Sequence, residues 1–128
     1  MDKTAGNILI EEGTQKVVFS QGELELSITA NDHLSTVENI ATLDAANITF
    51  PLLLRKWKQG DYFYPLGMRK KKKISRFLVD RKVSLPDKEK VWVVESNKKI
   101  IWVIGYRVDD RFKITSSTGK ILKLEFKK

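Results

Sequence analysis

The sequence predicts an α+β fold: a small, mostly antiparallel β domain with one or two short helices. The first observation is size, since 128 residues, of which 41% are hydrophobic, suffice for one packed core. The second is pattern, because short β-favouring runs separated by turn residues fill the first and last thirds of the chain. The third is that helical spacing of apolar residues is confined to brief stretches.

The first fifty residues favour short strands. Residues 7–11 and 16–20 are brief β-leaning runs separated by a turn at Gly13. Residues 24–29 alternate apolar and polar side chains strictly, as a strand with one buried face does. Further on, apolar residues recur with helical spacing over 37–43, which predicts a helical turn despite the indifferent helix formers between them.

One strand and one shaped loop are expected at the centre of the chain. Residues 52–58 are interpreted as a strand that ends in a turn at 59–61. Residues 62–68 are rich in aromatic side chains and closed by Pro65 and Gly67. Because proline stiffens the backbone and glycine admits angles that side chains resist, this stretch indicates a shaped loop rather than a regular element.

Two short helical segments are expected next. Ile74, Phe77 and Leu78 have the spacing that puts side chains on one helical face, which predicts a helix over 75–82. A proline follows, and residues 87–90 are expected to form a second, shorter helical turn that starts near it.

The last third returns to β structure. Residues 91–94 and 100–104 flank a polar stretch and predict a hairpin with a loop of about four residues, 96–99. Residues 112–115 and 121–126 flank a Ser/Thr/Gly-rich turn and predict a second strand pair. Both pairs support the antiparallel assignment.

The charge is distributed unevenly along the chain. Lys and Arg total 24 against 16 acidic residues, a net charge of +8. Residues 1–54 carry a net charge of −6, residues 55–82 carry +9, and residues 83–128 carry +5. A block of this kind attracts polyanions, so nucleic acid is the first expected partner and an anionic membrane surface the second.

Several function classes are excluded or disfavoured by what the sequence lacks. There is no cysteine, so thiolate metal sites and thiol catalysis are excluded, and the seven glycines form no phosphate-binding loop. The only histidine, His33 beside Asp32, is interpreted as a solvated turn residue rather than a catalytic base. Arginines flank Asp109 and Asp110, which favours ion pairing or turn capping over catalysis. We therefore predict no catalytic residue, metal site, cofactor or membrane span, and a soluble protein of a reducing compartment, the cytoplasm.

The densest positive charge is the run of five cations at 69–73, and aromatic residues frame it. By itself such a run is most often solvated surface. Cations that meet phosphates, interleaved with aromatic faces that stack on bases, are typical of RNA-binding surfaces. The alternative is a protein-docking module that packs on a catalytic partner domain through an exposed aromatic patch of Trp57, Tyr62 and Tyr64.

Three stretches resemble a known family when they are taken together. They read Leu54-Arg55-x-Trp57-x-x-Gly60-Asp61-x-Phe63-x-Pro65-Leu66-Gly67-Met68, then Lys72-Lys73-Ile74-Ser75-x-Phe77-Leu78-Val79-Asp80-x-Lys82, and finally residues 101–113. Their combination resembles the C-terminal domain of tRNA(Ile)-lysidine synthetase over about residues 44–126. The chain is accordingly interpreted as a β-rich preceding segment, 1–43, that packs with or leads into this domain, 44–128.

The resemblance implies a role in tRNA modification. The family's enzyme is a ligase that uses ATP and magnesium, in an N-terminal catalytic domain, to join lysine to a cytidine in the anticodon of a minor isoleucine tRNA. The Ser-Gly-Gly-x-Asp-Ser loop of that domain is absent from this sequence. The chain is therefore expected to bind tRNA at the acceptor stem without being an enzyme by itself. Expected partners are that tRNA and the catalytic domain, and pairing of surface strands would give a homodimer.

The resemblance also implies residue roles. Carried over position by position, it assigns phosphate contacts to Arg55, Lys72, Lys73 and Lys82. Gly60, Asp61 and Gly67 would shape the loop, and Pro65 would stiffen it. Together with the charge and the aromatic residues, the full set of expected tRNA contacts is Arg55, Lys56, Lys58, Tyr62, Tyr64, Arg69, Lys70, Lys71, Lys72, Lys73, Arg76 and Lys82.

Overall fold

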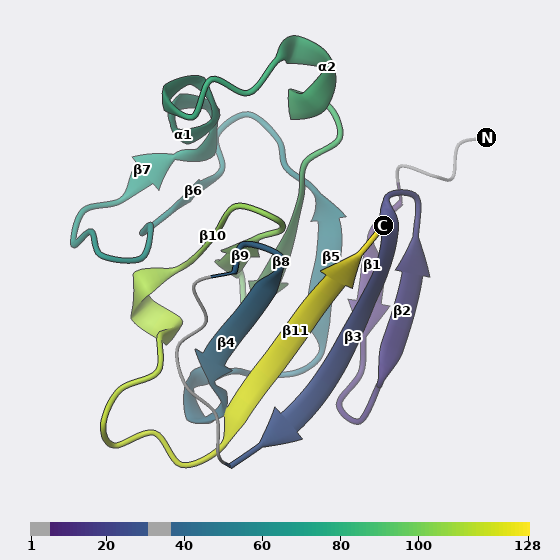
Figure 1. Cartoon of the computed structure of the whole chain (residues 1–128), viewed down its shortest axis with the longest axis vertical. Helices are drawn as coiled ribbons and strands as arrows, with labels where there is room; N and C mark the ends of the chain where they lie inside the picture. Colours follow the sequence, from purple (N-terminus) through teal and green to yellow (C-terminus); the bar gives the residue numbers. More distant parts are fainter. Residues whose placement is uncertain (1–5, 31–36) are drawn as a thin grey trace.

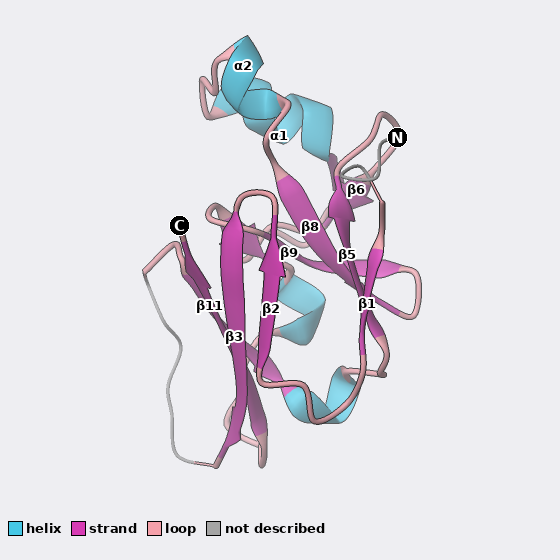
Figure 2. Cartoon of the chain, turned by 90° about the vertical axis from the view of Figure 1, so that its right-hand side faces the viewer, coloured by secondary structure: helices cyan, strands magenta, loops and turns pink. Residues whose placement is uncertain are grey.

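Two antiparallel sheets pack around the main core, and a two-stranded sheet and two short helices lie at one end (Figures 1 and 2). The computed structural model describes residues 6–30 and 37–128. The five-stranded sheet has the order β1-β5-β8-β9-β10, the four-stranded sheet the order β2-β3-β11-β4, and the small sheet pairs β6 with β7. The strands are β1 (Ile8–Ile10), β2 (Lys16–Phe19), β3 (Gly22–Thr29), β4 (Ile40–Asp44), β5 (Leu52–Lys56), β6 (Tyr62–Phe63), β7 (Lys72–Lys73), β8 (Trp92–Ser96), β9 (Lys99–Val103), β10 (Arg107–Val108) and β11 (Ile121–Lys127). The helices are α1 (Ile74–Asp80) and α2 (Leu85–Lys88), with 3₁₀ turns η2 (Ala45–Asn47) and η3 (Asp110–Phe112). The predicted α+β class is confirmed.

Strands β8 and β9 are buried on both faces. Trp92 and Val94 of β8 belong to the main core between the two large sheets, whereas Val93 belongs to a second core. That second core lies beneath α1 and includes Phe63 and Phe77, whose rings meet edge to face with centroids 5.1 Å apart. Burial on both faces explains why these strands are continuous apolar runs rather than alternating ones.

The described part of the N-terminal segment shares both sheets with the rest of the chain. Strand β1 pairs with β5, and β3 pairs with β11 along seven residues of each strand. The backbone at Lys127 passes so close to Gly22 that a Cβ atom at Gly22 would lie 2.2 Å from the Lys127 carbonyl oxygen. Strands from both ends of the sequence therefore enclose the main core.

Two expectations about secondary structure are wrong. Residues 40–43, expected as part of a helical turn, belong to β4, because this strand pairs with the free edge of β11 and buries Ala41 and Leu43. The expected hairpin between 112–115 and 121–126 does not form, because β11 pairs with β3 and β4 and residues 110–112 form η3. Long-range pairing overrides the local pattern in both cases.

The other departures are smaller. The hairpin of β8 and β9 is confirmed, but its turn has only two central residues, Asn97 and Lys98, with φ values of +50° and +68°. Positive φ at both positions is the type I′ geometry that fits twisted strands. The shaped loop at 62–68 begins with the short strand β6, which pairs with β7. Among the described residues, no helix has the length and apolarity needed to cross a membrane.

Candidate nucleic-acid interface

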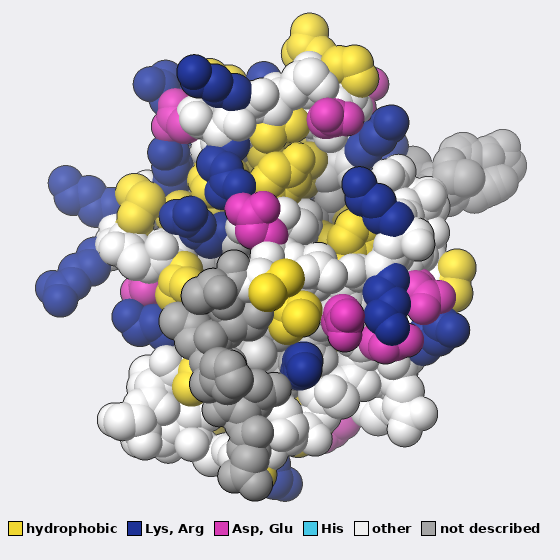
Figure 3. Space-filling view, in the orientation of Figure 1, with side chains coloured by type: hydrophobic (Ala, Val, Ile, Leu, Met, Phe, Trp, Pro, Cys, Tyr) yellow, Lys and Arg dark blue, Asp and Glu magenta, His cyan; other side chains and the backbone are white. Residues whose placement is uncertain are grey.

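The strongest positive charge lies on the connection between β6 and β7. Residues 69–73, here called the cationic loop, follow a turn in which the Met68 N–H donates to the Pro65 carbonyl at 2.8 Å. Gly67 makes this turn at φ +91°, a backbone conformation that side chains resist. Four of the five cations are exposed, and only Lys72 is half-buried. Figure 3 shows Lys and Arg side chains projecting on the side where Figure 1 places this connection.

Asp109, which lies next to η3, holds the segment that precedes the cationic loop. Its carboxylate is fully buried and accepts hydrogen bonds from the Tyr64 N–H at 2.9 Å and the Arg111 N–H at 2.8 Å. The Arg111 guanidinium donates to both carboxylate oxygens, at 3.0 and 2.9 Å. The buried carboxylate of Asp109 therefore joins the segment at Tyr64 to η3, which agrees with the predicted ion pairing and turn capping.

Asp110 adds a second attachment. Its Oδ1 accepts from the Gly67 N–H at 3.0 Å and from Lys113 Nζ at 3.2 Å, while its own N–H donates to the Tyr64 carbonyl at 2.6 Å. The bond from Gly67, assisted by Lys113, lowers the pKa of Asp110 although partial burial opposes the shift. The turn before the cationic loop is thus held at Tyr64 and at Gly67.

The expected phosphate contact at Arg55 must be corrected. Only 6% of this residue is exposed, and its guanidinium donates to both oxygens of Asp61, at 2.9 and 3.0 Å, and to Glu95. Burial would lower the pKa of Arg55, but the hydrogen bonds with Asp61 and Glu95 outweigh it and raise the pKa. Asp61 also accepts from the Lys58 N–H at 2.8 Å, which closes the turn containing Gly60 at φ +95°. Arg55 and Asp61 therefore support the interface from below.

Lys72 and Arg76 share one acidic partner. Lys72 Nζ lies 2.6 Å from Asp80 Oδ2, and Arg76 Nε lies 3.3 Å from Asp80 Oδ1. The hydrogen bond from Lys72 lowers the pKa of Asp80, with Arg76 adding to the effect. Arg76 is exposed and Lys72 is half-buried, and Asp80 compensates part of the charge of both cations.

Two tyrosines lie beside the cations. Tyr62 is 44% exposed, and Lys71 Nζ lies 4.7 Å from the centre of its ring. Tyr64 is half-buried, and the Arg111 guanidinium lies 4.3 Å from the centre of its ring. The two rings meet edge to face with centroids 6.4 Å apart. Cations and aromatic faces are therefore interleaved on this surface, as expected from the sequence.

The remaining expected cations are spread around this centre. Lys56, Lys58 and Lys82 are exposed, the last at the end of α1 with φ +58°. The tRNA contacts expected from the sequence do not include Lys98 and Lys99, which the β8–β9 hairpin brings to the same neighbourhood as Tyr62 and Arg111. The sequence places this pair of lysines in the turn between two predicted strands, but only the fold shows which residues that turn faces.

The aromatic patch expected for protein docking is not assembled as a whole. The Trp57 side chain packs against the second core, and its indole N–H donates to the Lys88 carbonyl at 2.7 Å. Only Tyr62 of the three expected aromatic residues is exposed. Phe63 and Phe77 are buried, as expected for core residues.

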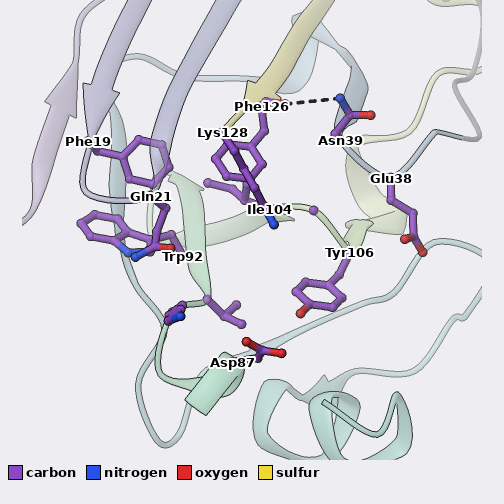
Figure 4. A pocket seen from close by; sticks show the side chains of 13 residues that line it. Phe19, Gln21, Glu38, Asn39, Asp87, Trp92, Ile104, Tyr106, Phe126 and Lys128 are labelled. Atoms are coloured by element: carbon purple, nitrogen blue, oxygen red, sulfur yellow. Dashed lines mark hydrogen bonds between the residues drawn. The ribbon is translucent and has the colours of Figure 1, made fainter. Parts of the chain in front are cut away.

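Within residues 6–30 and 37–128, no cluster of three metal-ligating side chains occurs. His33 and Asp32 lie outside the described residues. Figure 4 shows a separate pocket of about 510 Å³ between Phe19, Trp92, Tyr106 and Phe126, with Glu38 and Asp87 at its edge. Burial raises the pKa of Tyr106 there. None of the residues that line this pocket belongs to the expected tRNA contacts.

Fold and surface together define a small α+β domain of two large sheets and one two-stranded sheet, with a cationic and aromatic surface next to a segment that Asp109 and Asp110 hold by hydrogen bonds. The family model described as "TilS substrate C-terminal domain" matches residues 52–125. The chain therefore belongs to the TilS substrate C-terminal domain family, as the sequence motifs indicated.

The similar proteins carry a consistent name. Over 80% of this chain, a protein named tRNA(Ile)-lysidine synthase from Parabacteroides distasonis is 42% identical, and the match covers 23% of that protein. Over 77% of this chain, the protein of the same name from Bacteroides thetaiotaomicron is 39% identical, again covering 23% of its length. The chain thus spans about a quarter of the curated relatives it matches.

Solved structures agree on the fold. The structure titled "Crystal structure of TILS C-terminal domain" superposes with a TM-score of 0.71, covering 94% of this chain and 89% of that chain at 16% identity. An N-terminal fragment of the phenylalanyl-tRNA synthetase β-subunit from Pyrococcus horikoshii gives a TM-score of 0.57, covering 66% of this chain and 27% of that chain at 14% identity.

Proposed function

We propose that this domain binds tRNA through its cationic surface as the C-terminal part of a cytoplasmic tRNA(Ile)-lysidine synthase. In that setting it would hold the acceptor stem of a minor isoleucine tRNA. A catalytic domain, supplied with ATP and magnesium, would join lysine to the anticodon cytidine. The names of the relatives and the family model support the parent enzyme. The domain itself contributes binding rather than chemistry.

The observation that carries the proposal is the rigid presentation of exposed cations beside tyrosines. The cationic loop is fastened through Tyr64 and Gly67 to Asp109 and Asp110, so its cations project from a fixed ledge. A phosphate that meets a fixed cation orders fewer side chains on binding than one that meets a mobile arm. An RNA duplex is recognised mostly through its phosphates and 2′-hydroxyls, which this arrangement of charge suits.

Docking onto the catalytic domain is the second candidate role. Exposure of Tyr62 and Met68 beside the cationic loop favours some protein contact there. The burial of Trp57 removes its largest expected anchor. Tight binding to the catalytic domain in the absence of RNA would support this role.

A charge-matched pair of double variants tests the proposal. Lys70→Ala with Lys71→Ala removes two charges from the cationic loop, and Lys16→Ala with Lys120→Ala removes two charges from the four-stranded sheet and its preceding turn. If each loop lysine meets one phosphate, the slope of log affinity for tRNA against log salt decreases by about 1.4–1.8 in the first variant only. Equal decreases in both variants would show that only net charge matters and would contradict the proposal.

A further inference from the structure

A small pocket beside the cationic loop has the features of a site for a single anionic group. It has a volume of about 100 Å³ and lies between the β8–β9 turn, the turn after β5, and η3. Its walls include Arg55, Asp61, Tyr62, Lys98, Lys99 and Arg111. Pockets that hold drug-sized molecules are several times larger, so this one suits a small group rather than a base.

The charges around the pocket leave a surplus of one positive charge. Arg55 is offset by Asp61 and Glu95, and Arg111 is offset by Asp109. Lys98 and Lys99 are exposed, and no carboxylate among the described residues forms an ion pair with either one. Four cations against three carboxylates give +1, which one phosphodiester, with its single negative charge, would neutralise.

The backbone of the turn supports a role for Lys98. Its φ of +68° is the second positive value of the type I′ turn, a position where glycine is favoured because it has no Cβ atom. A lysine held in this conformation strains the backbone, and strain of this kind concentrates where a side chain serves a function. Lys98 is one of the residues that line the pocket.

Two of the residues that line the pocket, Arg55 and Asp61, are held by hydrogen bonds. Arg55 and Asp61 are 6% and 8% exposed and hydrogen-bonded to each other, so the turn at Gly60 is fixed against β5. Tyr62 is shared with the proposed tRNA surface, because Lys71 of the cationic loop lies over its ring. A chain of phosphates that follows the cationic loop would therefore reach the pocket without leaving the protein surface.

We propose that this pocket, formed by Lys98, Lys99, Arg111 and Tyr62, binds one backbone phosphate of the tRNA. The inference rests on the proposed function and adds a contact that lies about 25 residues further along the chain than the cationic loop. It makes the β8–β9 turn part of the binding surface. Free inorganic phosphate has the same chemistry and serves as a probe for the pocket alone.

The test exploits the strained turn. Lys98→Gly removes the cation and relieves the strain, so it should fold at least as stably as the wild type. Its affinity for tRNA should depend less on salt, with a slope lower by about 0.7–0.9. Between 0.05 and 0.2 M salt, the loss of affinity should then be about threefold smaller than in the wild type. Asn97→Gly relieves the neighbouring positive φ without changing charge and should leave the slope unchanged.

The outcomes separate this inference from the proposed function. If Lys98→Gly and Lys99→Ala both keep the wild-type slope while the Lys70/Lys71 double variant loses part of it, the pocket is not a phosphate site and the function stands. If the Lys70/Lys71 variant and its charge-matched control behave alike, the proposed function fails first. Inorganic phosphate should shift the backbone amide resonances of Gly60 and Ile100 in the wild type but not in Lys98→Gly. Equal shifts in both proteins would overturn the proposal.

Discussion

The buried carboxylate of Asp109 offers the sharpest test of how the interface is held. Replacing it by asparagine keeps the size of the side chain but removes the charge that Arg111 and two backbone N–H groups share. Asparagine has one acceptor oxygen, so it cannot receive all four hydrogen bonds. Its NH₂ group would also face the donors of Arg111. The Asp109→Asn variant should therefore weaken the connection between Tyr64 and η3, leaving the bond from the Asp110 N–H to the Tyr64 carbonyl.

The cost of this change can be bounded from the geometry. Asp109 is fully buried, whereas the side chain of Arg111 is 31% exposed, so water can compensate the arginine in part. Hydrogen bonds to a charged group contribute about 1.5–3 kcal/mol, and breaking a fully buried pair costs about 3–5 kcal/mol. We expect the free energy of unfolding to decrease by about 2–3 kcal/mol. For a domain of this size, the melting temperature should decrease by about 8–12 °C.

Urea denaturation and thermal melts of the two proteins measure this directly. Asp110→Asn is the matched control, because Asp110 lies in the same turn, is 20% exposed at its side chain and, among the described residues, accepts side-chain hydrogen bonds from Gly67 and Lys113 alone. It should cost about 1 kcal/mol. If the stability of Asp109→Asn lies within about 0.5 kcal/mol of the wild type, the range of ordinary surface substitutions, the buried carboxylate does not hold this part of the fold.

The affinity of Asp109→Asn for tRNA is a second measurement, for which two explanations predict opposite changes. Asp109→Asn raises the net charge from +8 to +9, so long-range attraction alone predicts tighter binding to tRNA. If the ledge must be rigid, the variant binds more weakly although it is more positive. An affinity equal to or above that of the wild type, measured under conditions where the variant is folded, would show that the attachment at Asp109 is unnecessary for binding.

Two further predictions concern the end of α1 and acid stability. Lys82 has φ +58°, and the hydrogen bonds of Lys82 to Val79 and of Val83 to Leu78 form a Schellman motif that favours glycine. Lys82→Gly should therefore stabilise the fold by about 0.4–1 kcal/mol in urea denaturation while lowering the salt slope for tRNA by about 0.7–0.9; a slope equal to that of the wild type would remove Lys82 from the interface. The hydrogen bond from Gly67 holds the pKa of Asp110 below its ordinary 3.8, so its carboxylate stabilises the fold above that pH, and this contribution is lost as the pH falls through the lowered pKa. The stability difference between the wild type and Asp110→Asn should thus be constant at neutral pH and shrink below about pH 3.8, whereas an undiminished difference near pH 2 would contradict the assignment.

The sequence predicted the elements whose pattern is local. Strand β3 shows strict alternation, the β8–β9 hairpin has turn residues between two apolar runs, and α1 has three apolar side chains on one face. Strand β4 was mistaken for a helical turn because its partner β11 lies about 80 residues later. Local sequence patterns do not reveal strand pairing over such a distance. The pairing of β11 with β3 likewise takes the place of the expected final hairpin.

The candidate interface was predicted in its charge but not in its construction. The exposure of Lys70 and Lys71 and the packing of Lys71 on Tyr62 agree with the interleaving of cations and aromatic residues read from the sequence. Arg55 was misassigned because an arginine in a basic stretch looks the same whether it meets a phosphate or a buried carboxylate. Only the fold brings Glu95 beside it, about 40 residues later in the sequence. The position of Lys98 beside Tyr62 and Arg111 depends on the fold in the same way.

A comparison of three ligands tests whether this surface holds the acceptor end of a tRNA. We would titrate the domain against the isoleucine tRNA with a CAU anticodon, an acceptor-stem minihelix and a duplex DNA of matched length, each at two salt concentrations. We expect tRNA and minihelix to bind alike and both to bind more tightly than DNA at near-physiological salt. Equal affinities for all three ligands, lost together as salt rises, would contradict this expectation and leave the surface as a non-specific electrostatic tether.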